Sequence, residues 1–111
     1  MNKPTIVCLC GSTRFWKQFQ EVNAKLTLDG KIVLSVGCDM KTDTELFGGV
    51  SPETLRLVKA KLDVLHFRKI ALADYIYVIN VGNYIGESTE REIEYAKSLG
   101  KHVYYLEGNN A

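Results

Sequence analysis

Four glutamates lie close together in the stretch GESTEREIEYA, which runs from Gly86 to Ala96. This stretch follows DYIYVIN, an apolar run typical of a buried strand, so the carboxylates fall where a strand gives way to a helix. A partly desolvated carboxylate at such a point can act as a nucleophile or as a base. Carboxylates there can also cap the helix and stabilise its dipole, so each glutamate has to be weighed separately.

The first glutamates of the stretch have an ordinary structural explanation. Glu87 and Glu90 lie at the predicted helix entrance, where negative charge is favourable. Thr89 and Glu92 fit the capping-box pattern, with Thr89 as the N-cap and Glu92 three residues later. Capping is therefore the structural alternative to catalysis for Glu92.

Helical geometry singles out Glu92 among the remaining glutamates. Glu94 lies two positions later, and two residues turn a helix by about 200°, so the two side chains cannot share a task. Glu92 shares a face with Ala96 and Leu99, which are four and seven residues further along. A carboxylate on this packed face, near the strand end, would be partly desolvated, so Glu92 is our candidate nucleophile or base.

Asp74 is a second candidate acid because it lies beside the third predicted strand. It precedes this strand rather than following it. The structural alternative is that Asp74 ends a helix and begins the strand.

The first loop, CGSTR, places Gly11, Ser12, Thr13 and Arg14 at the mouth of a helix. Backbone N–H groups at a helix N-terminus attract anions, and the hydroxyls and the guanidinium add donors, so this loop suits a phosphate group. An ordinary helix cap beside a solvated arginine is the alternative. Neither GxxxxGK[ST] nor GxGxxG spacing is present, so we do not expect ATP hydrolysis or dinucleotide binding.

The cysteines argue for a reducing compartment. Their number is odd (Cys8, Cys10 and Cys38), which is unfavourable for a disulfide framework. Cys8 and Cys10 alternate along one strand and face the same side, where we interpret them as small buried hydrophobes. His66 and His102 show no metal-ligand spacing relative to them, so we expect no metal site.

Composition restricts the class of protein. The chain has 111 residues with 46% apolar residues, which predicts one folded domain over residues 1–111. The net charge is +1 and no basic run is present, so we do not expect binding to a nucleic-acid duplex. No segment approaches the roughly 20 apolar residues that a membrane span needs. We expect a soluble, cytoplasmic protein with no membrane partner.

Strands and helices alternate along the chain. Apolar patterns predict strands over 6–10, 32–36, 75–80 and 102–106, and helices over about 15–28, 52–72 and 89–99, with an irregular segment at 37–50. This alternation predicts a three-layer, Rossmann-like or flavodoxin-like α/β domain with a parallel sheet of four to five strands in the order 2-1-3-4. Ligands of such sheets bind where the strand order reverses, here between the loops at 11–14 and 81–89.

These motifs together resemble the nucleoside 2-deoxyribosyltransferase superfamily. The motifs are CGSxR after the first strand, an Ala-Asp pair before the third strand, and a helix reading E-I-x-Y-A followed by Gly-Lys. The CGSTR loop makes the chain most similar to the 2'-deoxynucleoside 5'-monophosphate N-hydrolases. The resemblance runs along almost the whole chain, although each motif is short.

The resemblance implies an N-glycosidase that cleaves the base–sugar bond of a nucleoside 5'-monophosphate, by hydrolysis or base transfer. Glu92 would attack the anomeric carbon through an oxocarbenium-like transition state, and Asp74, with His66 in reserve, would protonate the departing base. It also implies a homodimer or higher oligomer and neither metal nor organic cofactor. The substrate would be held by Gly11, Ser12, Thr13, Arg14, Gly86, Ser88 and Thr89. Tyr84 is our candidate to stack on the base because it lies in the 81–89 loop.

The chain departs from the family pattern at several positions. Gly86 stands where the transferases carry an aspartate, Cys8 where an aromatic residue lines the sugar site, Glu94 where a glycine follows E-I, and His66 where an acidic residue is usual. These changes weaken the transferase interpretation more than the hydrolase one. They also leave an alternative from another class, a nucleotide-binding sensor module that performs no chemistry.

Overall fold

The computed structural model describes residues 3–36, 49 and 51–108, and the predicted irregular segment at 37–50, apart from Gly49, lies outside this range together with Cys38. The described elements are β1 (Ile6–Gly11), η1 (Thr13–Phe15), α1 (Trp16–Leu28), β2 (Ile32–Leu34), α3 (Pro52–Leu72), β3 (Tyr75–Ile79), η2 (Val81–Asn83), α4 (Glu87–Ser98) and β4 (His102–Tyr105). No helix in the described ranges is both long and apolar enough to cross a membrane.

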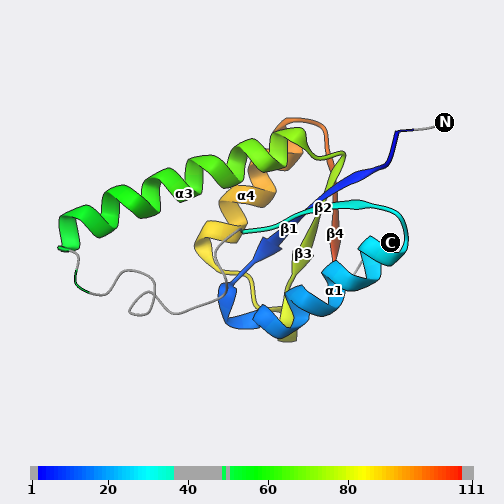
Figure 1. Cartoon of the computed structure of the whole chain (residues 1–111), viewed down its shortest axis with the longest axis horizontal. Coiled ribbons are helices and arrows are strands. Elements are labelled where there is room, and N and C mark those ends of the chain that lie inside the picture. The colour runs from blue at the N-terminus through cyan, green and yellow to red at the C-terminus, as the bar shows by residue number, and fades with distance from the viewer. Residues whose placement is uncertain (1–2, 37–48, 50, 109–111) are drawn as a thin grey trace.

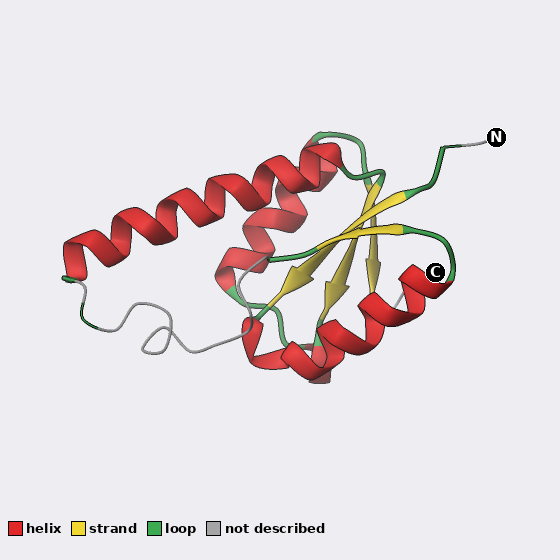
Figure 2. Cartoon of the chain, viewed as in Figure 1, coloured by secondary structure: helices red, strands yellow, loops and turns green. Residues whose placement is uncertain are grey.

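The four strands form one parallel sheet in the order β2-β1-β3-β4, which confirms the predicted order. Helix α1 covers one face of this sheet, and α3 and α4 cover the other (Figure 1, Figure 2). The strand order reverses between β1 and β3, whose register pairs Cys10 with Val78 and Gly11 with Ile79. Loops that leave these two strands at their carboxyl ends therefore lie next to each other.

The side chains of β1 alternate between two separate cores. Val7 and Leu9 pack with Phe19 and Val22 of α1. Cys8 and Cys10 belong to the other core, which also contains residues of β3, α3 and α4 (Ile70, Ala73, Ile76, Val78, Ile93 and Ala96). Because successive side chains of a strand point to opposite faces, the thiols lie on the α3–α4 side.

Helix α3 begins as the sequence predicts. The Ser51 hydroxyl accepts a hydrogen bond from the Thr54 backbone N–H. Pro52 occupies the first turn, where the backbone N–H that proline lacks would have no partner within the helix. The helix continues without a break to Leu72, and its buried residues, His66 and Ile70, both lie in its last two turns. The fold thus buries a histidine where α3 covers β1.

Helix α4 begins earlier than predicted. Its N-cap is Gly86, and its first residue is Glu87, so Thr89 lies inside the first turn and is buried. The predicted capping box of Thr89 and Glu92 is therefore wrong, because the strand–helix connection is shorter than the pattern indicated. Glu92 falls in the second turn, where the backbone N–H groups are already bonded within the helix.

The end of β1 is held very close to β3 at Gly11. This residue has φ 149°, and a Cβ atom placed on it would lie 2.8 Å from the backbone oxygen of Ile79. Only glycine tolerates that approach.

Candidate active site

The two predicted binding loops meet at the carboxyl edge of the sheet. The Arg14 guanidinium lies 4.4 Å from the centre of the Tyr84 ring, and its Nη2 donates to the Tyr84 hydroxyl at 3.4 Å. The Phe15 ring also packs edge-to-face against the Tyr84 ring, with the ring centres 6.0 Å apart. The expectation that the 11–14 and 81–89 loops come together is confirmed, since each contributes one partner to this contact.

The first loop is organised by Ser12. Its side chain accepts hydrogen bonds from the Arg14 backbone N–H at 3.4 Å and from Arg14 Nε at 3.1 Å. Ser12 thus serves as the N-cap of η1, while Thr13 and Arg14 stay exposed. The capping role expected as an alternative is therefore present, and the guanidinium that it orients remains open to solvent.

The second loop brings Gly86 under Tyr84. A Cβ at Gly86 would lie 3.3 Å from the Tyr84 hydroxyl, so a larger residue here would press on the tyrosine. Ser88 is exposed and accepts a hydrogen bond from Arg91 Nη2 at 3.2 Å, whereas Thr89 is buried. Of the two hydroxyls considered for the phosphate, Ser88 is therefore the one that faces solvent.

Glu92 is the inward-facing glutamate of α4. Glu87, Glu90 and Glu94 are exposed, whereas the Glu92 side chain is only 14% exposed. It lies between the buried residues Thr89, Ile93 and Ala96. The structure thus separates one carboxylate from the other three, as helical spacing predicted.

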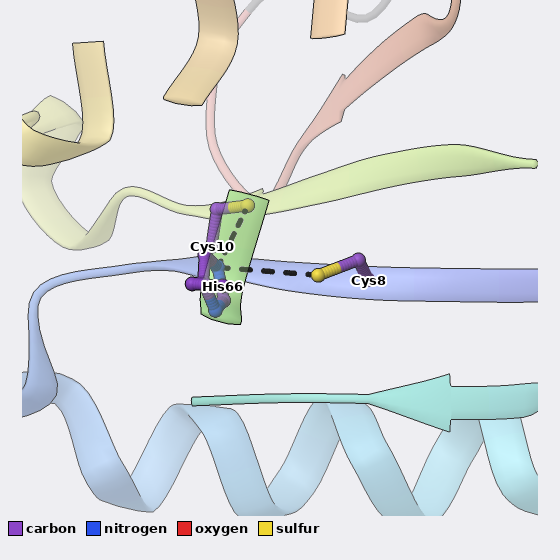
Figure 3. A group of neighbouring side chains, drawn as sticks. All are labelled: Cys8, Cys10 and His66. Atoms are coloured by element: carbon purple, nitrogen blue, oxygen red, sulfur yellow. Dashed lines mark hydrogen bonds between the residues drawn. The ribbon is translucent and has the colours of Figure 1, made fainter. Parts of the chain in front are cut away.

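A cluster of titratable side chains surrounds Glu92. His66 Nε2 lies 3.8 Å from Glu92 Oε1, 3.4 Å from Cys10 Sγ and 3.9 Å from Cys8 Sγ. Figure 3 shows one imidazole nitrogen facing both sulfur atoms, with the cysteines on β1 and the histidine on α3. Both thiols and the histidine are buried, which removes most of the water that would otherwise screen their charges.

Burial controls the charge of Glu92. Loss of solvation raises the pKa of Glu92 to about 7, and the Cys8 thiolate and Asp63 act in the same direction. His66 and a hydrogen bond from Cys10 oppose this rise. A carboxylate with such a pKa is more basic than an ordinary glutamate and is present in both charge states near neutral pH.

The pKa values of Cys8, Cys10 and His66 are shifted by their mutual contacts. Hydrogen bonding from the Cys10 thiol and the nearby His66 lower the pKa of Cys8 to about 6 despite its burial. The interaction with Cys8, followed by burial, raises the pKa of Cys10. Burial alone would lower the pKa of His66, but Cys8 and Glu92 outweigh it and raise the pKa overall. Both shifts favour the charged forms, a Cys8 thiolate and a His66 imidazolium, which stabilise each other.

Asp74 is not brought to this cluster. Its carboxylate accepts the Ile6 backbone N–H at 2.7 Å, and its own N–H donates to the Ile6 carbonyl at 2.7 Å. These bonds join the beginning of β1 to the beginning of β3, four residues before Cys10, which corresponds to about 13 Å along a strand. In this chain the structural alternative for Asp74 is the one that its contacts support.

The cysteines are the part of the site that sequence reasoning missed. Cys8 and Cys10 were interpreted as small buried hydrophobes, and His66 lies 58 and 56 residues from them in sequence. The usable signal was limited to the alternation of two thiols at the end of a central strand, because His66 lies on α3, beyond β2.

A separate groove of about 620 Å³ is lined by residues of both α3 and α4. Its lining does not include Glu92, so it is not the candidate active site. The residues that line it are Val64, Phe67, Arg68, Arg91, Glu94 and Tyr95.

No model of a known protein family matches the chain, and a search of the curated proteins found no match.

Proposed function

We propose that the protein is an N-glycosidase that cleaves the base–sugar bond of a nucleoside 5'-monophosphate, with Glu92 as nucleophile. The proposal keeps the resemblance to the nucleoside 2-deoxyribosyltransferase superfamily, and the observation that carries it is the isolation of Glu92. One carboxylate of the four in α4 is turned inward, next to the end of β1 from which the Ser12–Arg14 loop departs.

The phosphate would bind beyond the carboxyl ends of β1 and β3. The Arg14 guanidinium, the Ser88 hydroxyl and the free N–H groups that begin α4 are donors suited to a dianion. Tyr84 is 42% exposed, and the base would stack on the part of its ring that Arg14 leaves uncovered. Binding at both ends of the nucleotide would hold the sugar between them and align its anomeric carbon.

The reaction follows a double displacement. A Glu92 oxygen bonds to C1' while the C1'–N bond breaks, and the base leaves with a proton. His66 is our candidate donor, because Cys8 and Glu92 raise its pKa despite burial and its Nε2 lies 3.8 Å from Glu92. Water then attacks C1', gives its proton back to His66 and releases the sugar phosphate, which frees Glu92. A second base in place of water would give base transfer.

The decisive assay is chromatographic detection of free base from a panel of ribo- and deoxynucleoside monophosphates and the matching nucleosides. Glu92→Gln should reduce kcat/KM by roughly a thousandfold or more, because it removes the nucleophile. Glu94→Gln is the matched control, since it changes an exposed glutamate two residues away on the same helix. Equal base release by both variants would remove Glu92 from the chemistry.

A nucleotide-binding module without turnover is the second candidate. The packing of Glu92 against the buried cysteine–histidine cluster favours it, because a carboxylate engaged there is less available to a substrate. This candidate predicts that Glu92→Gln binds monophosphates as tightly as the wild type while neither protein releases base. Equilibrium dialysis beside the chromatographic assay separates the two functions.

A further inference from the structure

Three metal-ligating atoms converge at the centre of the α3–α4 side of the sheet. Cys8 Sγ, Cys10 Sγ and His66 Nε2 all lie within 4.8 Å of one another, and all three residues are buried (Figure 3). The strand pleat fixes both sulfur atoms on one face, and the crossover helix α3 brings the imidazole to them. The positions of these ligands are thus set by β1 and α3 rather than by a flexible loop.

The separations correspond to the edges of a tetrahedron around a small ion. With zinc–sulfur bonds near 2.3 Å and zinc–nitrogen bonds near 2.0 Å, neighbouring ligand atoms are separated by about 3.3–3.8 Å. The distances from His66 Nε2 are 3.4 Å to Cys10 Sγ and 3.9 Å to Cys8 Sγ. Small side-chain rotations would therefore allow all three atoms to reach one ion.

Glu92 is the candidate for the fourth corner, which it would reach by a side-chain rotation. Glu92 Oε1 lies 3.8 Å from the same imidazole nitrogen, on a side chain that is mostly shielded from water. A carboxylate oxygen is a common zinc ligand, and two thiolates with an imidazole favour zinc over hard cations such as magnesium. The His66 Nδ1 atom makes no hydrogen bond to any described residue, so nothing there prevents it from carrying the ring proton. That tautomer leaves Nε2 free to bind the ion.

We propose that Cys8, Cys10, His66 and Glu92 form a binding site for one Zn²⁺ ion or a similar soft divalent cation. Binding displaces the protons that remain on the two sulfur atoms and on His66 Nε2, and these protons pass to solvent. The bound ion engages the Glu92 carboxylate, so the loaded protein has no free nucleophile. This last consequence rests on the proposed function, whereas metal binding itself does not.

The test uses cobalt as a spectroscopic probe, without any nucleotide. Reduced full-length protein is freed of metal by chelation and titrated with Co²⁺ under anaerobic conditions, and Zn²⁺ is then added in competition. The expected result is a thiolate-to-cobalt absorption band that saturates at one ion per chain and disappears with Zn²⁺. A folded protein without this band, or with a band that persists in the Cys8→Ser/Cys10→Ser double variant, overturns the proposal.

Variants then identify the ligands. Cys10→Ser and His66→Gln should weaken Co²⁺ binding by roughly a hundredfold or more, and Glu92→Gln by about 10- to 100-fold. His102→Gln, at an exposed position of β4, is the control and should bind as the wild type does. Equal affinity in the wild type and Glu92→Gln would exclude Glu92 as the fourth ligand.

A second measurement does not depend on the folding of any variant. Wild-type protein is alkylated with and without Zn²⁺, and the modified cysteines are located by peptide mass spectrometry. Zn²⁺ should slow modification of Cys8 and Cys10 by at least about tenfold. Equal labelling of these two cysteines with and without Zn²⁺ contradicts the site. Because neither experiment contains a substrate, both can succeed when base release fails, and the reverse also holds.

Discussion

The two faces of β1 come from alternating residues of one strand, yet their surroundings differ in chemistry. Val7 and Leu9 enter a purely apolar core with α1. Cys8 and Cys10, on the other face, meet His66 and Glu92. The same backbone therefore supports hydrocarbon packing on one side and a cluster of proton-exchanging groups on the other.

This difference teaches how a small domain combines stability with a reactive interior. Burying ionisable groups weakens a fold unless they are paired, so the cluster side contributes less stability for each residue that it buries. The α1 side can offset that loss, because apolar contacts there carry no such penalty. Because β1 belongs to both cores, apolar packing on the α1 side also holds Cys8 and Cys10 in position on the other side.

The largest expected effect contrasts the two faces directly. Leu9→Ala should lower the free energy of unfolding by about 2–5 kcal/mol, because it leaves a cavity at a fully buried position. Cys10→Ala, on the other face, removes one sulfur atom and should cost about 1 kcal/mol. Urea denaturation of both variants measures this difference. Equal losses would show that the two faces contribute alike.

The pH dependence of stability sharpens the contrast. Glu92 faces His66 and Asp63 of α3 and Cys8 and Cys10 of β1, and its pKa is raised from 4.5 to about 7. The folded state therefore holds a proton that the unfolded state releases, so this group's contribution to stability falls as the pH rises from about 4.5 to about 7. The loss is at most about 3 kcal/mol.

Urea denaturation between pH 4.5 and pH 8, with a chelator present, measures this contribution. Glu92→Gln should gain stability relative to the wild type across that range, because glutamine never ionises. Glu94→Gln is exposed and should follow the wild-type curve. A constant difference between Glu92→Gln and the wild type at every pH would show that burial does not shift this carboxyl group.

A substitution of Arg14 tests the proposed phosphate site at the carboxyl edge of the sheet. Arg14→Ala should raise the KM for a nucleoside monophosphate about tenfold, because a charge-assisted hydrogen bond to the phosphate is lost. The matching nucleoside, which has no phosphate, should be unaffected. Arg56→Ala, on the exposed part of α3, is the control for general charge. Equal changes for monophosphate and nucleoside would contradict a phosphate-binding loop.

The smallest expected effect lies at the opposite end of the strand. Asp74→Asn should lower stability by about 1 kcal/mol, because the amide accepts the Ile6 N–H less strongly than the carboxylate does. Base release per folded molecule should not change. A large loss of kcat in Asp74→Asn with normal stability would return Asp74 to the catalytic machinery.

Much of the fold could be read from the sequence because its signals are local. Ile6 to Cys10 is continuously apolar, as a strand buried on both faces must be. Ser51 and Pro52 mark the beginning of α3, and the strand order follows from crossover handedness. The predicted beginning of α4 is wrong because the actual N-cap, Gly86, has no side chain and so gives no capping signal in the sequence. Thr89 has a typical N-cap side chain, but it lies inside the helix.

The site was only half predictable. Helical spacing identified Glu92, and the loop composition identified Arg14 and Tyr84, since both depend on short-range patterns. The approach of His66 to Cys10 depends on how far α3 runs before it returns to the sheet, which no sequence spacing encodes. The resemblance to a family likewise placed Asp74 in a role that its contacts at the amino end of the sheet do not support.

The close contact between Gly11 and Ile79 restricts the register of β1 against β3, and this register determines where the reactive side chains lie. A slip of β1 by one residue against β3 would bring Cys10 or Ser12 opposite Ile79, where the backbone leaves no space for a Cβ. The same slip would exchange the faces of β1, sending both thiols towards α1 and two aliphatic side chains towards Glu92. A residue with no side chain therefore decides on which side of the sheet the reactive groups lie.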